Sequence, residues 1–73
     1  MRHEYQAEKQ VAKRIKALRV KAGFTQEQLA EKTGIGYKYI QAMEGKTPKS
    51  ITVRSLEKLA KALDVDLIEF FRF

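Results

Sequence analysis

The 73-residue chain contains no cysteine and only one histidine and one proline. The lack of cysteine excludes a disulfide framework, a thiolate metal site and a cysteine nucleophile. Because the single histidine, His3, lies near the N-terminus, we expect no histidine-based catalytic or metal cluster. No apolar run approaches the roughly 20 residues that span a bilayer, and no secretory signal follows the basic N-terminus. We therefore expect a small soluble domain in the cytoplasm, with no metal, no cofactor and no membrane partner.

Acidic residues are also scarce. Fifteen Lys and Arg residues against nine Asp and Glu residues give a formal net charge of +6 and a pI near 9.8. Residues 2–21 carry seven basic side chains and two acidic ones, whereas Asp64, Asp66 and Glu69 make the C-terminal end acidic. A basic domain attracts phosphate backbones, anionic membranes or acidic proteins. The uneven charge indicates either a binding face or a basic surface that is merely solvated.

Apolar residues recur at helical spacing, and no alternation typical of strands is present. The pattern predicts one all-α domain over residues 1–73, with its core in 8–71 and helices at 8–22, 26–33, 37–44, 53–63 and 66–71. The buried face of the first helix is expected to hold Val11, Ile15, Leu18 and Ala22. Gly23 is a plausible stop for this helix. Thr25 and Gln28 fit a capping box that begins the next one.

The second and third helices are separated by only three residues, which predicts a helix-turn-helix unit over residues 25–44. Ala30 is small enough to let the two helices approach, and Gly34 permits a positive φ in the turn. Ile35 and Ile40 would anchor the pair. Such a unit holds its second helix outward, so that this helix can enter a major groove of DNA. An ordinary pair of antiparallel helices has the same spacing, so the pattern alone leaves both interpretations open.

Several longer runs carry a more specific signal. They are Arg14-Ile15-Lys16-Ala17-Leu18-Arg19, Gly23-Phe24-Thr25-Gln26-Glu27-Gln28-Leu29-Ala30, Thr33-Gly34-Ile35 and Leu56-Glu57-Lys58-Leu59-Ala60-Lys61-Ala62-Leu63. In this order they resemble the phage repressor and Cro-like (XRE) family of helix-turn-helix regulators, over about residues 11–71. The resemblance implies a five-helix, lambda-repressor-like DNA-binding domain that acts as a homodimer on a pseudo-palindromic operator. The starts of the third and fourth helices look somewhat like restriction–modification controller proteins.

The resemblance also implies roles for individual residues. Base contacts fall at the start and middle of the third helix, on Tyr37, Lys38, Gln41 and Ala42. A phosphate contact falls at the start of the second helix, on Gln26 with Thr25 beside it. A structural ion pair of the family corresponds to Arg19 and Glu44.

The chemistry of these side chains suits the roles. Gln41 can pair bidentately with adenine and Lys38 can donate to guanine O6 and N7, each worth about 1–3 kcal/mol of discrimination. Lys38 can equally choose a phosphate. Tyr37 can reach a base edge, a phosphate or a thymine methyl, and Ala42 can touch a thymine methyl or simply allow close approach. Tyr39 either reaches a phosphate through its hydroxyl or packs on the neighbouring helix.

Basic residues after the third helix are further candidates for phosphate contacts: Lys46 and Lys49 in the loop, and Arg54 at the start of the fourth helix. The alternative is a solvated loop and an arginine with no specific role. The chain departs from the family in two places. Gly36 stands where relatives commonly have a serine or threonine N-cap, a loss of a few tenths of a kcal/mol. Gly45 follows the third helix directly, and the loop after it is longer than usual, which weakens the assignment of the loop lysines.

The C-terminal segment predicts an interface. The buried positions of the family correspond to Val65, Leu67, Phe70 and Phe71. Ile68 falls where relatives usually have a polar residue, and Phe73 lies beyond the motif. Two extra apolar side chains at the end of a small domain suggest a subunit interface, with packing onto the first helix as the alternative. A homodimer also makes physical sense, because one recognition helix offers too few contacts for operator specificity.

The leading hypothesis is a sequence-specific transcription regulator that binds double-stranded DNA as a homodimer. The alternative is an antitoxin or anti-regulator that acts mainly through a protein partner at Ile68 and Phe73. Membrane-surface binding is disfavoured, because the basic first helix needs its apolar face for the core. An enzyme is disfavoured as well, because the sequence offers no carboxylate pair, nucleophile–base set or metal cluster, and its glutamates read as helix-surface charges.

Overall fold

The structure is a computed structural model that describes residues 6–48 and 51–73. Its elements, in chain order, are α1 (Ala7–Lys21), α2 (Gln26–Thr33), α3 (Tyr37–Glu44), α4 (Val53–Leu63) and the 3-10 helix η1 (Leu67–Phe71). The described residues contain no strand, which confirms the all-α class. The described residues form five helical elements, and the last of them, expected as a helix at 66–71, is a 3-10 helix.

The end of α1 is set by glycine. Gly23 has a φ of +83°, and its N–H donates to the Val20 carbonyl at 3.0 Å. The Phe24 N–H donates to the Arg19 carbonyl at 3.1 Å, which completes the two-bond arrangement that closes many helices. Ala22, which was expected on the buried face, is instead the exposed C-cap residue.

Two helices begin with a capping box. At α2, Thr25 Oγ1 accepts from the Gln28 N–H at 3.0 Å, and Gln28 Oε1 accepts from the Thr25 N–H at 2.9 Å. The same exchange joins Thr52 and Ser55 at the start of α4. The second box was not predicted, because serine stands where glutamate or glutamine usually signals it.

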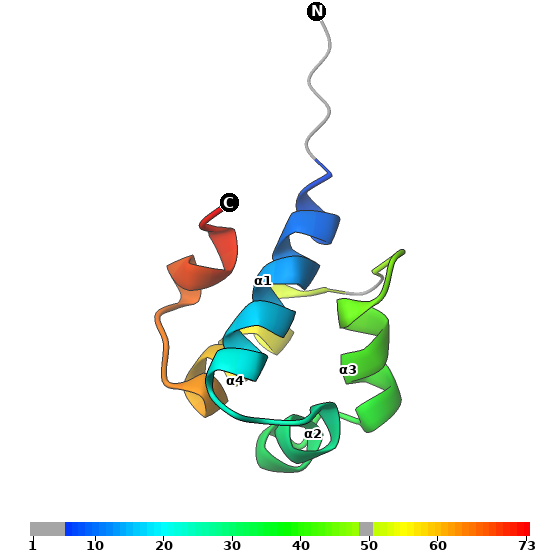
Figure 1. Cartoon of the computed structure of the whole chain (residues 1–73), viewed down its shortest axis with the longest axis vertical. Coiled ribbons are helices and arrows are strands. Elements are labelled where there is room, and N and C mark those ends of the chain that lie inside the picture. Colours follow the sequence, from blue (N-terminus) through cyan, green and yellow to red (C-terminus); the bar gives the residue numbers. More distant parts are fainter. Residues whose placement is uncertain (1–5, 49–50) are drawn as a thin grey trace, which may run out of the picture.

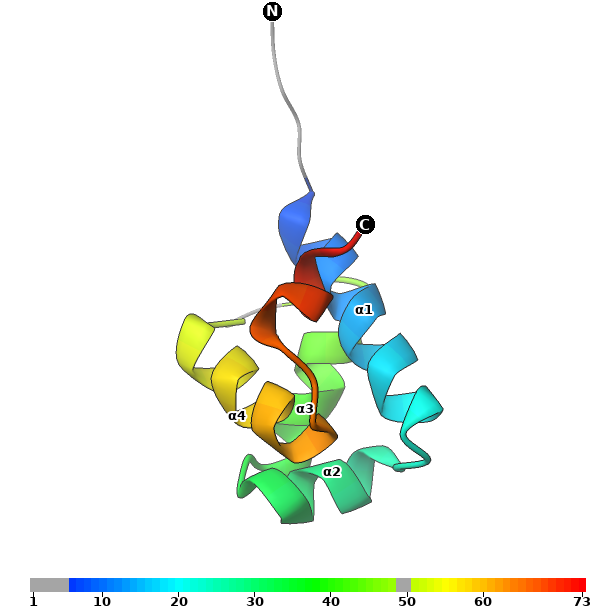
Figure 2. The same ribbon diagram turned by 90° about the vertical axis from the view of Figure 1, so that its left-hand side faces the viewer.

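Every element contributes at least one fully buried side chain to a single core. These side chains are Ile15, Leu29, Ile40, Met43, Leu59 and Phe70. Figure 1 shows α3 and η1 on opposite sides of α1. In Figure 2, η1 lies across α1 and α4. The core therefore fixes α3 on one side of the molecule and the C-terminal segment on the other.

The 3-10 geometry of η1 changes which C-terminal side chains are buried. With three residues per turn, side chains three positions apart share a face. Phe70 is fully buried, but Phe71 lies on the same side as the exposed Ile68 and is 47% exposed. Leu67 is also on the surface. The expected burial of Leu67 and Phe71 is wrong for the single chain. The three-residue repeat accounts for the exposure of Phe71, and nothing in it explains that of Leu67.

Candidate nucleic-acid interface

A three-residue turn joins α2 to α3. Gly34 takes the left-handed conformation, with a φ of +76°. Thr33 Oγ1 donates to the Leu29 carbonyl at 2.8 Å and accepts from the Ile35 N–H at 3.1 Å, so one hydroxyl ties α2 to the turn. Gly36 has a φ of −60° and begins α3 without a side-chain cap. Positive φ is therefore needed at only one of the two turn glycines.

The far end of α3 is held by an ion pair with α1. Arg19 Nε donates to Glu44 Oε2 at 2.8 Å and Arg19 Nη2 donates to Glu44 Oε1 at 3.0 Å. Arg19 Nη1 also donates to the Phe24 carbonyl at 2.7 Å, and Gln26 Nε2 donates to Glu44 Oε1 at 3.1 Å. The two charged side chains are only 10% and 2% exposed. The expected Arg19–Glu44 pair is thus present, and it fixes α1, the start of α2 and the end of α3 together.

The outer face of α3 is polar and exposed. It carries all four candidates for base contacts, which are Tyr37, Lys38, Gln41 and Ala42. Gln41 Nε2 donates to Tyr37 Oη at 3.0 Å, so these two side chains are held as a pair. The bond leaves the amide oxygen and the second amide hydrogen of Gln41 for an outside group. The contacts of these residues with bases stay predictions.

The candidates at the start of α2 already have partners within the chain. Thr25 Oγ1 serves in the capping box, and one amide hydrogen of Gln26 goes to Glu44. The backbone N–H groups of Gln26 and Glu27 have no acceptor among the described residues. The first N–H groups of a helix are natural donors to an anion. A phosphate contact at the start of α2 stays a prediction. Both backbone N–H groups and side chains are available there as donors.

Of the remaining phosphate candidates, Tyr39 and Arg54 lie near the start of α4. Lys46 is exposed, and Lys49 lies outside the described residues. Tyr39 and Arg54 line one hollow between the turn and α4, together with Lys58. Lys58 was missed by the sequence analysis. Its signal is the spacing from Arg54, because residues four apart share a face of a helix.

The C-terminal end carries an apolar surface. Four exposed side chains form this C-terminal patch: Leu67, Ile68, Phe71 and Phe73. Ile68 and Phe73 are 59% and 60% exposed, so α1 does not cover them. Arg14 of α1 holds the segment in place, because its Nε donates to the Glu69 carbonyl at 2.8 Å. A subunit interface at this patch stays a prediction.

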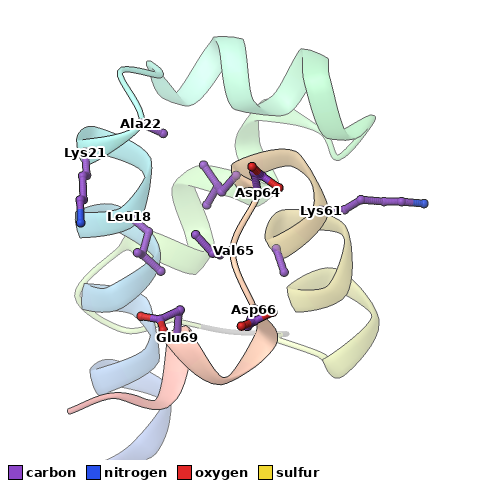
Figure 3. Close-up of a pocket in the computed structure, with 10 residues that line it drawn as sticks. Leu18, Lys21, Ala22, Lys61, Asp64, Val65, Asp66 and Glu69 are labelled. Atoms are coloured by element: carbon purple, nitrogen blue, oxygen red, sulfur yellow. The ribbon is translucent and has the colours of Figure 1, made fainter.

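A hollow of about 740 Å³ lies between the C-terminal ends of α1 and α4 and the segment that leads into η1 (Figure 3). Its charged residues are Lys21, Lys61, Asp64, Asp66 and Glu69. No residue of α2 or α3 lines it, so it is separate from the helix-turn-helix face.

Neither a metal site nor a membrane span is found within the described part of the chain. Its residues contain no group of three His, Cys, Asp or Glu side chains that could hold a metal ion. Among its helices, none combines the length and the apolarity that a membrane crossing needs.

Comparison with known proteins places this geometry in context. A family model described as Helix-turn-helix (HTH_3) matches residues 15–70. The HTH-type transcriptional regulator SinR of Bacillus subtilis (strain 168) is 32% identical over 57 residues, which are 78% of this chain and 51% of SinR. The chain thus spans about half the length of the curated relatives it matches.

Solved structures of restriction–modification controller proteins are similar over nearly the whole chain. Wild-type C.Esp1396I has a TM-score of 0.81 and 35% identity, covering 93% of this chain and 88% of its own. C.AhdI from Aeromonas hydrophila has a TM-score of 0.83 and 30% identity, covering 92% of this chain and 100% of its own. C.Esp1396I is also known as a tetramer in complex with its natural 35 base-pair operator. These matches confirm the family resemblance seen in the sequence.

Proposed function

The chain belongs to the helix-turn-helix (HTH_3, XRE-type) family, and from that membership we propose that it is a sequence-specific transcription regulator that binds double-stranded DNA. The observation that carries the proposal is the construction of α3. One face of this helix is buried in the core, its C-terminal end is held by the Arg19–Glu44 pair, and its other face is polar and exposed. A rigid helix with a hydrogen-bonding outer face is what major-groove recognition requires. The proposed function is binding, with no catalytic step.

In this proposal α3 lies in the major groove and reads bases through Tyr37, Lys38, Gln41 and Ala42. Gln41 pairs with adenine through its amide oxygen and the amide hydrogen that Tyr37 does not use. The hydroxyl hydrogen of Tyr37 remains a donor, because its oxygen is the acceptor in the bond with Gln41. The two side chains therefore read neighbouring positions as one unit.

Phosphate contacts surround α3 in this arrangement. They come from Thr25, Gln26, Tyr39, Lys46, Lys49 and Arg54. At the start of α2 the backbone N–H groups of Gln26 and Glu27 add donors to the side chains. Such contacts fix the register of the protein on the duplex, and base contacts provide the specificity.

We further infer a homodimer on a pseudo-palindromic operator. The C-terminal patch, whose most exposed side chains are Ile68 and Phe73, is the proposed interface, and it lies across α1 from α3. The tetramer of C.Esp1396I on its operator supports an assembly of this kind. Since the proposed ligand is genomic DNA, the proposal places the protein in the cytoplasm.

Selection from a pool of random duplexes at two salt concentrations tests the proposal. The expected result is an inverted repeat, which is no longer recovered when Tyr37→Ala is combined with Gln41→Ala. Glu57→Gln, an exposed change on α4, serves as the matched control and should recover the same repeat. Weak binding without sequence preference, abolished by moderate salt, would contradict the proposal. Protein partners at the C-terminal patch would then become the leading hypothesis.

A further inference from the structure

Four lysines from two segments gather beside the end of α3. Lys9, Lys13 and Lys16 lie along α1, and Lys46 follows α3 in the loop; we call these four residues the lysine strip. All four are exposed, and they line one hollow together with Ala12, Glu44 and Gly45. Within the described part of the chain, none of the four forms an ion pair. The strip is therefore a concentration of positive charge that no described acidic side chain pairs with.

No described acidic residue near the strip forms an ion pair with its lysines. Glu44 lines the same hollow, but its side chain is 2% exposed and both of its oxygens are bound by Arg19. Glu8 lies at the next hollow along α1, beside Lys9, Thr47 and Pro48. The charges that solvent meets in the hollow are thus the four ammonium groups.

Taking the proposed function as its basis, we propose that the lysine strip is a second phosphate-binding surface. It extends along α1 the phosphate contact that the proposed function already assigns to Lys46. The argument is continuity: Glu44 and Gly45, where the proposed recognition helix ends, line the same hollow as the lysines of α1. From Lys9 to Lys16 the helix rises about 10 Å. This is about three steps of the roughly 3.4 Å axial rise per nucleotide in one strand of B-DNA, so about four successive phosphates span the same length along the duplex axis.

The chemistry of lysine favours the DNA backbone. Lysine carries a compact charge on a flexible stem and makes no planar, bidentate contact. Such a group suits phosphates, whose positions shift with the path of the backbone, and it carries no information about the sequence. The strip therefore adds affinity equally to operator and non-operator DNA. An acidic protein could be attracted by the same charge, but continuity with α3 favours DNA.

Two matched double variants test this inference. Lys13→Gln with Lys16→Gln removes two charges from the strip, and Lys21→Gln with Lys61→Gln removes two exposed charges from the hollow of Figure 3. The helix propensity of glutamine is close to that of lysine, so both variants should fold, which far-UV circular dichroism checks. Affinities for an operator duplex and for a random duplex are then measured over a series of salt concentrations.

In the strip variant, the slope of log affinity against log salt should become less negative by about 0.9 for each phosphate that the protein no longer neutralises. For two lysines the change in slope is up to about 1.8. The ratio of operator to random affinity should stay unchanged, and the control variant should keep the slope of the wild type. An unchanged slope in the strip variant would overturn the inference, and this is also the outcome expected if the strip binds an acidic protein. Equal flattening in both variants would overturn it too, because net charge alone would then explain the effect.

The same data separate this inference from the proposed function. The wild type could bind duplexes without sequence preference while the strip variant still changes the salt dependence of its affinity. This result would contradict the operator-reading function and support the phosphate-binding role of the strip. If the wild type is sequence-selective but the strip variant keeps its salt dependence, the operator-reading function is supported and the role of the strip is contradicted. A wild type that binds no duplex at all would overturn both.

Discussion

At the scale of single residues, Glu44 is the side chain of the helix-turn-helix unit through which three helices are connected. It ends α3, and it accepts hydrogen bonds from Arg19 of α1 and from Gln26 of α2. Because the side chain of Glu44 is only 2% exposed, these two partners replace the water that would otherwise solvate the carboxylate. The carboxylate therefore links the stability of the fold to the orientation of Gln26, a proposed phosphate contact.

Removing the cation from this pair should be costly. Arg19→Met leaves the Glu44 carboxylate buried with only Gln26 as a partner, and the free energy of unfolding should fall by about 3–5 kcal/mol. Urea denaturation measures the change. Arg72→Met is the control, because the Arg72–Glu69 pair is exposed at the arginine and should contribute less than about 1 kcal/mol. Similar decreases in the two variants would contradict a structural role for the buried pair.

A second residue-scale prediction concerns the pair on the outer face of α3. Tyr37→Phe removes the acceptor that orients the Gln41 amide, and operator affinity should fall by about 0.5–1.5 kcal/mol. The exposed ring remains, so the free energy of unfolding should hardly change. A double-mutant cycle with Gln41→Ala should give a coupling of at least about 0.5 kcal/mol on operator DNA. Strict additivity would show that the two residues read DNA independently.

At the scale of elements, the sequence predicts well wherever the signal is local. The Thr25 capping box and the Gly23 stop lie within a few residues of the helix ends they set, and the four α-helices were predicted to within one residue at each end. Residue types also predict which positions of α3 face outward. They do not predict that Tyr37 and Gln41 bond to each other, because that depends on the rotamers of both side chains.

The C-terminal helix shows where the sequence signal ends. The same few apolar residues can form an α-helix or a 3-10 helix, so composition does not distinguish the two. The two helices bury different side chains. The choice is made by the docking of Phe70 into the core and by the bond from Arg14 to the Glu69 carbonyl, which spans 55 positions of the chain. Such long-range packing is not visible in local spacing, and for this reason the exposure of Phe71 was missed.

The turn between α2 and α3 gives a prediction at this scale. Gly36→Ser should supply the missing N-cap of α3, because the backbone has an ordinary φ and an added Cβ would meet nothing within 4 Å. We expect a gain of a few tenths to about 1 kcal/mol, which corresponds to a rise of several degrees in Tm. Gly34→Ser, at a φ of +76°, should lower Tm because of backbone strain. Thermal unfolding followed by circular dichroism compares the two. If Gly36→Ser lowered Tm, serine would not be capping α3.

At the scale of the whole molecule, the two proposed interfaces are separated by the core. α3 and the C-terminal patch lie on opposite sides of α1, and the Arg14–Glu69 contact holds the patch to the same helix that Arg19 ties to α3. α1 therefore sets the geometry between the proposed DNA-reading face and the proposed interface between subunits. Subunit association can then position two recognition helices without covering either of them.

This arrangement makes the effect of a patch variant specific. Ile68→Asp places a charge in the proposed interface at a side chain that is largely exposed in the single chain, so the monomer should fold normally while dimerisation is abolished. Sedimentation equilibrium should show a monomer. Affinity for the full inverted repeat should fall by at least tenfold, because the two copies of α3 are no longer linked and bind independently. Affinity for a single half-site should not change.

Val20→Asp is the matched control for this variant, because Val20 is an equally exposed apolar residue outside the patch. It should keep both the dimer and the affinity for the inverted repeat. If Ile68→Asp weakened binding to the half-site as well, the patch would act on α3 through the fold. If Ile68→Asp left the dimer intact, the interface would have to lie elsewhere, and the side of the molecule across α1 from α3 would be open to a different protein.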